Sequence, residues 1–235
     1  MGSTSEKSYG SRIGNAEKML SALQSFNGYH AAHPELEIAV LDSLIDEIKA
    51  LNRRVASSKQ DNSLAIAARK GLYVSDELSI SKALLAINGN VMAAFGRKSK
   101  ESIEIYTIVK KTRGTNKKTP KNPDEDSISQ SYQSFNSIIQ FFADVVVHLT
   151  RYEADGNYNP SDPRLAVGSL NAQYEAGVAA NNLVVTTFSN FKQTNATRLE
   201  RYAFLSSLAL RLKDGVAAQY GKNSPEYAVI KKLFI

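Results

Sequence analysis

The residues best suited to metal binding lie close together in the first part of the chain. Imidazole and carboxylate groups are common zinc ligands. However, Gly28 ends the preceding helical pattern, and Pro34 suits the first turn of the next helix. His30 and His33 therefore fall in a loop, with no third histidine near in sequence, and we assign no metal site. The four residues are His30, His33, Glu35 and Glu37.

A second candidate for chemistry is His148, four residues after Asp144 on an apolar segment. Such a pair could act as an oriented general base, but a hydrogen-bonded structural histidine fits the same pattern. With no cysteine in the chain, disulfides, zinc–thiolate sites and cysteine nucleophiles are excluded. Phosphate-binding, dinucleotide, metalloprotease and hydrolase motifs are missing as well. The sequence predicts no catalytic residue and no cofactor, and it favours a protein that is not an enzyme without deciding the matter.

Two Arg–Tyr pairs share one spacing. Arg69 and Tyr73 lie four residues apart, as do Arg198 and Tyr202, so each pair lies on one face of a helix. The pairs could line a polar pocket for a ligand. Alternatively, the arginine stem packs over a half-buried tyrosine where two helices cross. We favour packing and keep the ligand interpretation open.

A short turn motif occurs twice, as Phe95-Gly96-Arg97-Lys98-Ser99 and Tyr220-Gly221-Lys222-Asn223-Ser224. In a ligand loop, Arg97 or Lys222 would bind an anion beside a helix N-terminus. In a structural turn, the glycine ends one helix and the serine caps the next. The structural interpretation accounts for nearly every position, and we favour it.

Positive charge is concentrated in one window. The chain has 29 basic and 23 acidic residues, a net charge of +6, and the window 110–121 holds six basic residues and no acidic one. Contacts to phosphates would make binding to nucleic acid strongly salt-dependent. No aromatic residue lies in the window to stack on bases, so a solvated linker is the favoured alternative. The six residues are Lys110, Lys111, Arg113, Lys117, Lys118 and Lys121.

The elements that would position these residues are helices. Apolar residues recur at spacings of three and four, and one series forms a heptad-like seam that requires a long antiparallel partner. This seam comprises Leu41, Leu44, Ile48, Leu51 and Val55. We expect helices at about 9–26, 34–55, 64–95, 100–111, 128–153, 163–191, 196–220 and 225–235, a polar loop at 57–63 and a break near 88–90.

The second half of the chain resembles the first. The segment that begins at Pro34 recurs 129 positions later at Pro163, and the turn at Gly96 recurs 125 positions later. The stretch that begins at Ser8 pairs with Ser131, at an offset of 123. We predict a tandem duplication, with a pseudo-twofold if the two copies face each other. The predicted parts are a disordered N-terminus 1–7, a helical module 8–112, a basic/acidic linker with prolines 113–126, and a second module 127–235.

The expected fold is therefore all-α, with two divergent tandem copies of a bundle of about three long helices and one short helix. The expected core comprises Leu41, Leu44, Ile48, Leu51, Val91, Phe95, Leu170, Tyr174, Phe188, Leu205, Leu208, Leu212 and Tyr220.

In function, we expect a non-catalytic helical interaction or scaffold protein whose partner is a protein. One alternative is a nucleic-acid-associated protein that uses residues 110–121. A second alternative is a small-molecule-binding or enzymatic bundle with a pocket between the modules. No apolar run approaches the roughly 20 residues that span a bilayer, so we expect a cytoplasmic location and no membrane partner.

Overall fold

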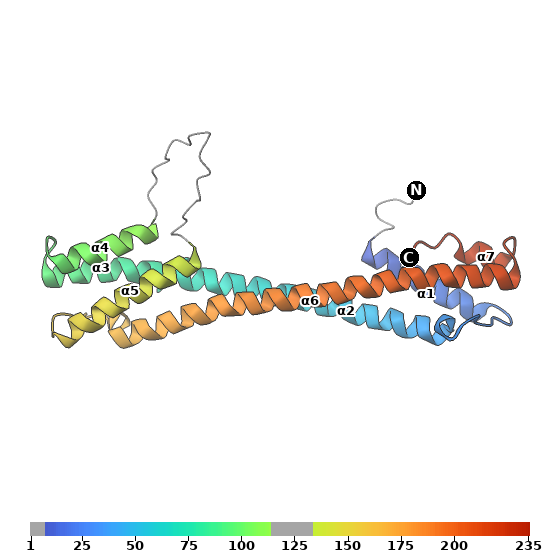
Figure 1. The fold of residues 1–235 in the computed structure, drawn as a ribbon, viewed down its shortest axis with the longest axis horizontal. Coiled ribbons are helices and arrows are strands. Elements are labelled where there is room, and N and C mark those ends of the chain that lie inside the picture. The colour runs from blue at the N-terminus through green and yellow to red at the C-terminus, as the bar shows by residue number, and fades with distance from the viewer. Residues whose placement is uncertain (1–7, 114–133) are drawn as a thin grey trace, which may run out of the picture. The chain divides into compact units, whose positions relative to one another are not determined.

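A computed structural model describes residues 8–113 and 134–235 (Figure 1). All regular structure in these ranges is helical, as the apolar periodicity predicted. The expectations for residues 1–7 and for nearly all of the linker 113–126 lie outside the described residues. In chain order the elements are α1 (Tyr9–Ser25), the 3-10 turn η2 (Pro34–Leu36), α2 (Ile38–Lys70), the π-helical turn η3 (Gly71–Ser75), α3 (Ile80–Phe95), α4 (Lys100–Arg113), α5 (Phe135–Ala154), the 3-10 turn η4 (Pro163–Leu165), α6 (Val167–Tyr220) and α7 (Pro225–Ile230).

The described chain divides into two compact units. Unit 1 comprises the described residues up to 60 together with 188–235, and unit 2 comprises 61–187. Unit 1 thus combines α1 and the first part of α2 with the last part of α6 and α7. Unit 2 combines the end of α2, α3, α4, α5 and the first part of α6. Each unit takes segments from both of the predicted modules 8–112 and 127–235.

Unit 1 has an apolar core to which α1, α2, α6 and α7 all contribute. The seam of α2 is buried as predicted, including Leu41 and Ile48, which have no exposed surface. Leu205 and Leu212 of α6 and Met19 of α1 join the same cluster. The helices are held by this shared burial, because fully burying one such side chain contributes about 1.5–3 kcal/mol.

Unit 2 has a second core. Ile80, Leu84 and Ile87 of α3 are fully buried and join Phe142 and Leu149 of α5 in one cluster. Within this unit α3, α4 and α5 pack against one another (Figure 1). The core also includes residues of α4 and of the first turns of α6.

Three predicted interruptions are wrong. Residues 57–63 lie inside α2, residues 88–90 lie inside α3, and the gap expected between 191 and 196 lies inside α6. The polar composition of 57–63 suggested a loop, but a helix needs only one buried face. Ser58 and Ala65 supply that face and are about 5% exposed, while most of their neighbours are exposed.

The real break lies between α2 and α3 and was not predicted. The chain leaves α geometry at Gly71–Ser75, where a π turn forms. The Asp76 N–H donates to the Gly71 carbonyl at 3.0 Å, and the Ser79 hydroxyl donates to the Val74 carbonyl at 3.1 Å. A π turn accommodates extra residues inside a helical path. No single residue type predicts such a turn from the sequence.

Most of the predicted core is confirmed. Nine of the thirteen residues are buried, and Phe95, Tyr174 and Tyr220 are partly buried and pack against the cores. The prediction that Phe188 belongs to the core is wrong, because its side chain is 48% exposed. The half-buried positions on α6 beside it are Val184, Thr187 and Phe191, so Phe188 falls one position outside that stripe.

One helical run, Ile38–Phe95, contains an 18-residue window of mean hydropathy 1.3, which suffices by length and composition to cross a membrane. Ile80, Leu84 and Ile87 of this run fill the core of unit 2. A soluble core helix that passes the same test is mostly buried, whereas 28% of this window is buried. The expectation of a cytoplasmic location stays a prediction.

Candidate functional site

The surface of unit 2 has a groove of about 620 Å³. One wall is formed by the π turn and the first turns of α3. The other wall is formed by η4 and the first turns of α6. The apolar lining residues are Leu72, Leu78, Ala83, Ala86, Pro163 and Leu165.

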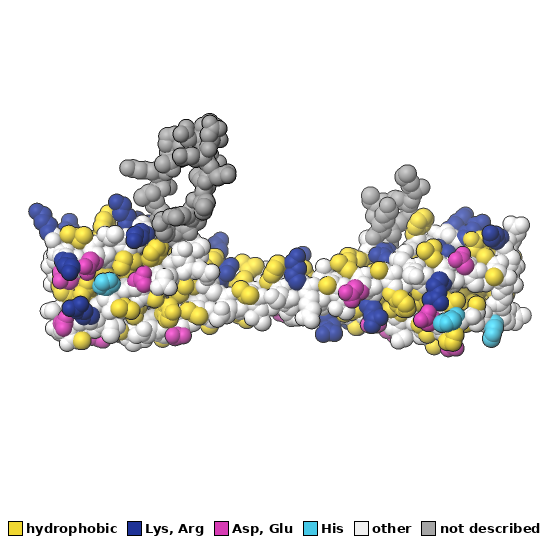
Figure 2. Space-filling model, in the orientation of Figure 1, with side chains coloured by type: hydrophobic (Ala, Val, Ile, Leu, Met, Phe, Trp, Pro, Cys, Tyr) yellow, Lys and Arg dark blue, Asp and Glu magenta, His cyan; other side chains and the backbone are white. Residues whose placement is uncertain are grey.

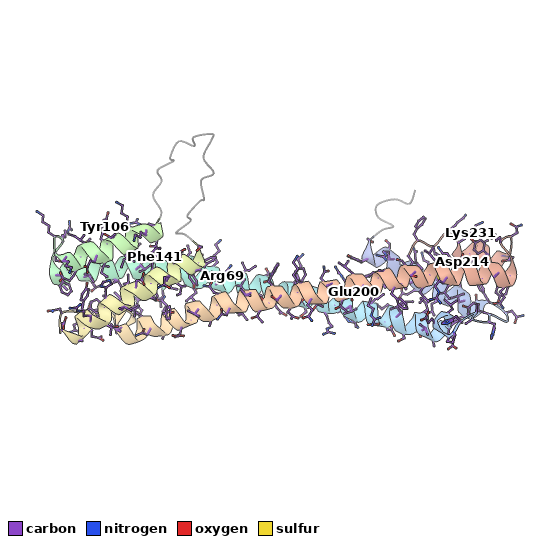
Figure 3. The ribbon with its side chains drawn as sticks, in the orientation of Figure 1. Arg69, Tyr106, Phe141, Glu200, Asp214 and Lys231 are labelled. Carbon is purple, nitrogen blue, oxygen red and sulfur yellow. The ribbon has the colours of Figure 1, made fainter. Side chains whose placement is uncertain are left out.

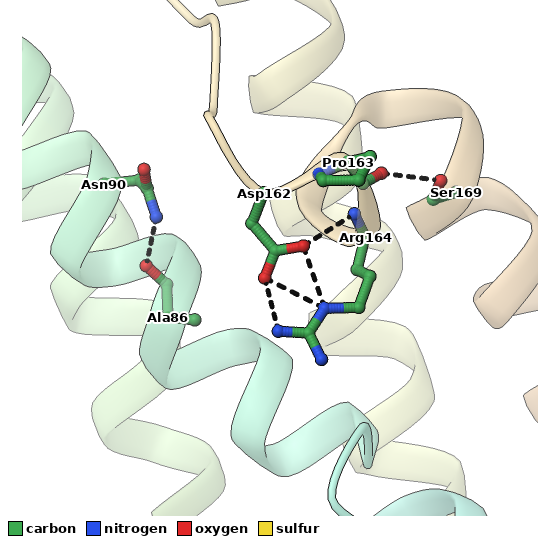
Figure 4. Close-up of polar contacts among 6 residues, drawn as sticks. All are labelled: Ala86, Asn90, Asp162, Pro163, Arg164 and Ser169. Atoms are coloured by element: carbon green, nitrogen blue, oxygen red, sulfur yellow. Dashed lines mark hydrogen bonds and ion pairs between the residues drawn. The ribbon is translucent and has the colours of Figure 1, made fainter.

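The corner at η4 is built by a local capping motif (Figure 4). Asp162 is the N-cap, and its Oδ1 accepts a hydrogen bond from the backbone N–H of Arg164 at 3.0 Å. Pro163 suits the first position because it needs no N–H there. The Arg164 guanidinium turns back onto Asp162, with Nε 2.8 Å from Oδ1 and Nη2 2.7 Å from Oδ2.

Electrostatics hold this corner in its charged form. The side-chain hydrogen bond from Arg164, and then the backbone hydrogen bond from its N–H, lower the pKa of Asp162. The same pair raises the pKa of Arg164. Both side chains reach solvent, so water screens the ion pair and its contribution to stability is small.

Three other polar side chains of the rim bond to nearby backbone, and the Glu77 carboxylate also lines the groove. The Ser169 hydroxyl donates to the Pro163 carbonyl at 2.9 Å. Gln173 Nε2 donates to the Leu78 carbonyl, and Lys82 Nζ lies 3.4 Å from the Ser75 carbonyl. The groove therefore offers an apolar lining inside a rim of charged and polar side chains. The apolar lining suits binding of an apolar group.

A smaller hollow, of about 320 Å³, lies in unit 1 beside the first turns of α2. Arg201 Nε pairs with Glu47 at 2.8 Å in its lining. Nearby in unit 1, Arg211 Nη1 binds Glu35 at 2.6 Å. The predicted 125-position offset pairs Arg211 with Ala86, whose methyl group lines the groove of unit 2.

The Arg–Tyr pair of unit 2 lies at a helix contact. Tyr73 is fully buried; its hydroxyl donates to the Gly177 carbonyl at 3.0 Å and accepts from Asn181 Nδ2 at 2.9 Å. Burial raises the pKa of Tyr73. Arg69, on the last turns of α2 near the start of α5 (Figure 3), lies 4.3 Å above the ring of Phe135.

The pair in unit 1 is arranged in the same way. The Tyr202 hydroxyl donates to the Tyr9 carbonyl at 3.1 Å and accepts from Asn52 Nδ2 at 2.9 Å. Arg198 lies 4.2 Å above the ring of Tyr9. In both units the arginine stacks on the first aromatic residue of α1 or α5, not on its partner tyrosine. Sequence reasoning gave the two asparagines no role, although each is a polar residue on a buried seam.

The repeated turns are helix caps. Gly96 and Gly221 have φ of +86° and +96°, a region that glycine enters at little cost. The hydroxyls of Ser99 and Ser224 accept the backbone N–H three residues later, each at 3.1 Å. The two basic residues of the turns are exposed: Arg97 and Lys222.

The histidines have structural surroundings. His33 caps η2, and its Nδ1 accepts from the Glu35 N–H at 3.2 Å. Within residues 8–113 and 134–235, no group of three or more His, Asp or Glu side chains could hold a metal ion. His148 Nδ1 lies 3.9 Å from Glu104, and Asp144 accepts from Gln140 instead.

Half of the predicted basic window can be placed. Lys110, Lys111 and Arg113 lie in the last turn of α4. Lys111 Nζ lies 5.8 Å from the ring centroid of Phe141 on α5, which is labelled in Figure 3. The other three residues lie outside the described ranges: Lys117, Lys118 and Lys121.

Comparison with known proteins gives no family for the chain. No protein-family model matches it, and neither the curated proteins nor the solved structures contain a significant match.

Proposed function

We propose that this chain is a non-catalytic helical interaction protein, and that the groove of unit 2 receives an apolar segment of a protein partner. The observation that carries the proposal is the open apolar groove itself. Its counterpart region in unit 1 carries the Glu35–Arg211 ion pair, whereas the groove has Ala86 at the corresponding position.

Exposed apolar surface supports the proposal. Leu78 lines the groove and is 51% exposed, and hydrophobic atoms show on the surface of unit 2 in Figure 2. Removing apolar surface from water contributes about 25 cal/mol per Å². Helical segments with apolar side chains at spacings of three and four commonly bind such grooves.

The test uses Ala86→Trp, which places an indole over the groove from an exposed position of α3. Ala94→Trp is the matched control, because Ala94 is exposed on the same helix and does not line the groove. A photo-reactive residue at position 86 or 94 in the intact protein would first identify the partner. The partner's affinity would then be measured by calorimetry.

The expected result is a crosslinked partner at position 86 only, whose affinity falls at least about tenfold with Ala86→Trp and stays unchanged with Ala94→Trp. Tenfold in affinity corresponds to about 1.4 kcal/mol. Equal crosslinking at both positions, or equal affinity of both variants, would contradict the proposal.

A small molecule is the second candidate occupant. The groove volume lies within the roughly 300–1,000 Å³ of typical ligand sites. Its walls come from residues 72–86 and 162–173, one stretch from each predicted module. Native mass spectrometry of the intact protein would detect such a ligand as a discrete mass increment. This increment should be lost in Ala86→Trp and kept in Ala94→Trp.

We also propose that the chain is a tandem duplication. Support comes from matching local features: Ser8 and Ser134 are both N-caps that accept a backbone N–H three residues later, and Tyr29 and Tyr158 both donate to a carbonyl seven residues later. The caps indicate an offset of 126 for the first helix. The offset of 123 inferred from Ser131 therefore needs revision, and Ser131 lies outside the described ranges.

A further inference from the structure

Both cores are shared between the two halves of the chain. We call residues 8–113 half A and residues 134–235 half B. The core of unit 1 combines Leu41 and Ile48 of half A with Leu205 and Leu212 of half B. The core of unit 2 combines α3 and α4 of half A with α5 and the start of α6 of half B. Either half by itself would expose two apolar surfaces.

Hydrogen bonds between the halves are reciprocal. In unit 1 an asparagine of half A, Asn52, donates to a tyrosine of half B, Tyr202, at 2.9 Å. In unit 2 the roles are exchanged, and Asn181 of half B donates to Tyr73 of half A at 2.9 Å. In this pair of hydrogen bonds each half contributes one asparagine and one tyrosine.

Ring contacts repeat the pattern. Phe26 of half A meets Tyr220 of half B, with ring centroids 5.8 Å apart. Tyr152 of half B meets Phe95 of half A at 4.9 Å. Each half supplies one ring at or near the end of its first helix and one that directly precedes a glycine, Gly96 or Gly221. Reciprocal use of the same kinds of residue is the property of an isologous interface.

We propose that halves A and B are binding partners in their own right, and that they form a tight one-to-one complex when no peptide bond joins them. Each half presents a two-part docking surface whose occupant is the other half. This inference goes beyond the groove and does not depend on what the groove binds.

The test uses the full chain with a protease site inserted between Lys118 and Thr119, cut after the protein has folded and been purified. The expected product elutes at the volume of the uncut protein and has, in native mass spectrometry, the summed mass of the two fragments. Elution as two separate fragments would overturn the proposal. Co-expression of residues 1–118 and 119–235 provides a second route, and absence of a one-to-one complex by both routes would also overturn it.

A half-exchange assay tests the named contacts. Cut protein labelled with ¹⁵N is mixed with unlabelled cut protein, and the appearance of mixed A·B pairs is followed by mass. The double variant Asn52→Ala, Asn181→Ala should exchange at least about tenfold faster than the unmodified sequence. Asn90→Ala is the matched control, because Asn90 bonds only to the Ala86 carbonyl of its own helix. Equal rates, or pairs of half B with half B alone, would contradict the assignment of half A as the partner.

The two proposals fail separately. Loss of a partner's binding to Ala86→Trp concerns the groove and does not bear on whether the cut halves of the unmodified sequence stay together. Separation of the cut halves would overturn the docking surfaces while leaving groove binding by the uncut protein intact.

Discussion

Gly177 on α6 is a position where one added carbon would disturb the packing of unit 2. A Cβ there would lie 2.6 Å from Ile139 Cδ1 and 3.1 Å from Ile80 Cδ1. Tyr73, whose hydroxyl binds the Gly177 carbonyl, lies against the same spot. An alanine at position 177 therefore fits only if the end of the Ile139 side chain shifts.

We expect Gly177→Ala to destabilise the protein by about 1–3 kcal/mol, because overpacking forces side chains from their preferred rotamers. Gly89→Ala is the control, since nothing lies within 4 Å of its added Cβ in α3. That substitution should stabilise the protein by up to about 1 kcal/mol. Urea unfolding measures both. Equal stabilisation by the two variants would show that Ile139 moves aside at little cost.

Tyr158 makes stability depend on alkaline pH. Its hydroxyl donates to the Leu165 carbonyl at 2.9 Å; burial, and then repulsion by Glu153, raise its pKa to about 12. Unfolded tyrosine has a pKa near 10, so above pH 10 the unfolded chain loses this proton first. The contribution of Tyr158 to the free energy of unfolding should stay constant below pH 10 and fall between pH 10 and 12, by up to about 3 kcal/mol.

The measurement is urea unfolding at pH 9 and pH 11. Burial also raises the pKa of Tyr73 and Tyr202, so the contribution of Tyr158 is isolated by comparison with Tyr158→Phe. A fall of the same size in the variant would show that Tyr158 does not contribute.

At the scale of elements, the continuity of α2 is the least expected feature. This helix runs for 33 residues from Ile38 to Lys70, through the polar stretch 57–63 that resembles a loop. Helical hydrogen bonds continue there because Ser58 and Ala65 keep one face buried.

Lys59→Pro should therefore cost about 3 kcal/mol or more, because proline removes a helical hydrogen bond and clashes with the preceding turn. Lys59→Ala, at the same exposed position, should change stability little. Thermal unfolding followed by circular dichroism compares the two variants. If Lys59→Pro melts at the temperature of Lys59→Ala, the helix is interrupted at that point.

At the scale of the whole molecule, each unit is built from segments far apart in sequence. Leu208 lies in half B but belongs to the core of unit 1 together with Ile13 and Met19 of α1. Leu208→Ala should cost about 2–5 kcal/mol through loss of burial and formation of a cavity. The segments that lose protection from hydrogen exchange should therefore be those of unit 1, and not those of the predicted module 127–235 that contains Leu208.

Hydrogen exchange with mass spectrometry makes this test. In Leu208→Ala, protection should fall in α1, which belongs to the other half, more than in α5, which belongs to the same half. Leu84→Ala is the matched control in unit 2 and should reverse the order. Faster exchange throughout half B, with α1 unaffected, would contradict the division into units.

Much of the local structure followed from the sequence. The caps at Ser99 and Ser224, the positive φ at Gly96 and Gly221, and the seam of α2 were all predicted. Each depends on residues within a few positions of one another, where side-chain chemistry and helical spacing decide the outcome. The prediction of Phe188 as a core residue failed because the periodic pattern located the buried face of α6 only to within one position.

The candidate site depended on tertiary structure. The lining residues Leu78, Ala86 and Pro163 belong to no recognisable sequence motif. They line one groove because residues 72–86 and 162–173 meet there in the folded chain. The paired asparagines, Asn52 and Asn181, were not assigned a role from the sequence. Their tyrosine partners could not be identified from it.

The sequence by itself determined that the chain is helical, where the short helices α1 and α4 begin and end, and most of the residues on the apolar faces. Only the tertiary structure decided which apolar faces cover each other, and thus that Asn52 meets Tyr202 while Asn181 meets Tyr73. The physical reason is that helical periodicity is a property of neighbouring residues. Burial is non-directional, so an apolar face requires cover without specifying which segment supplies it.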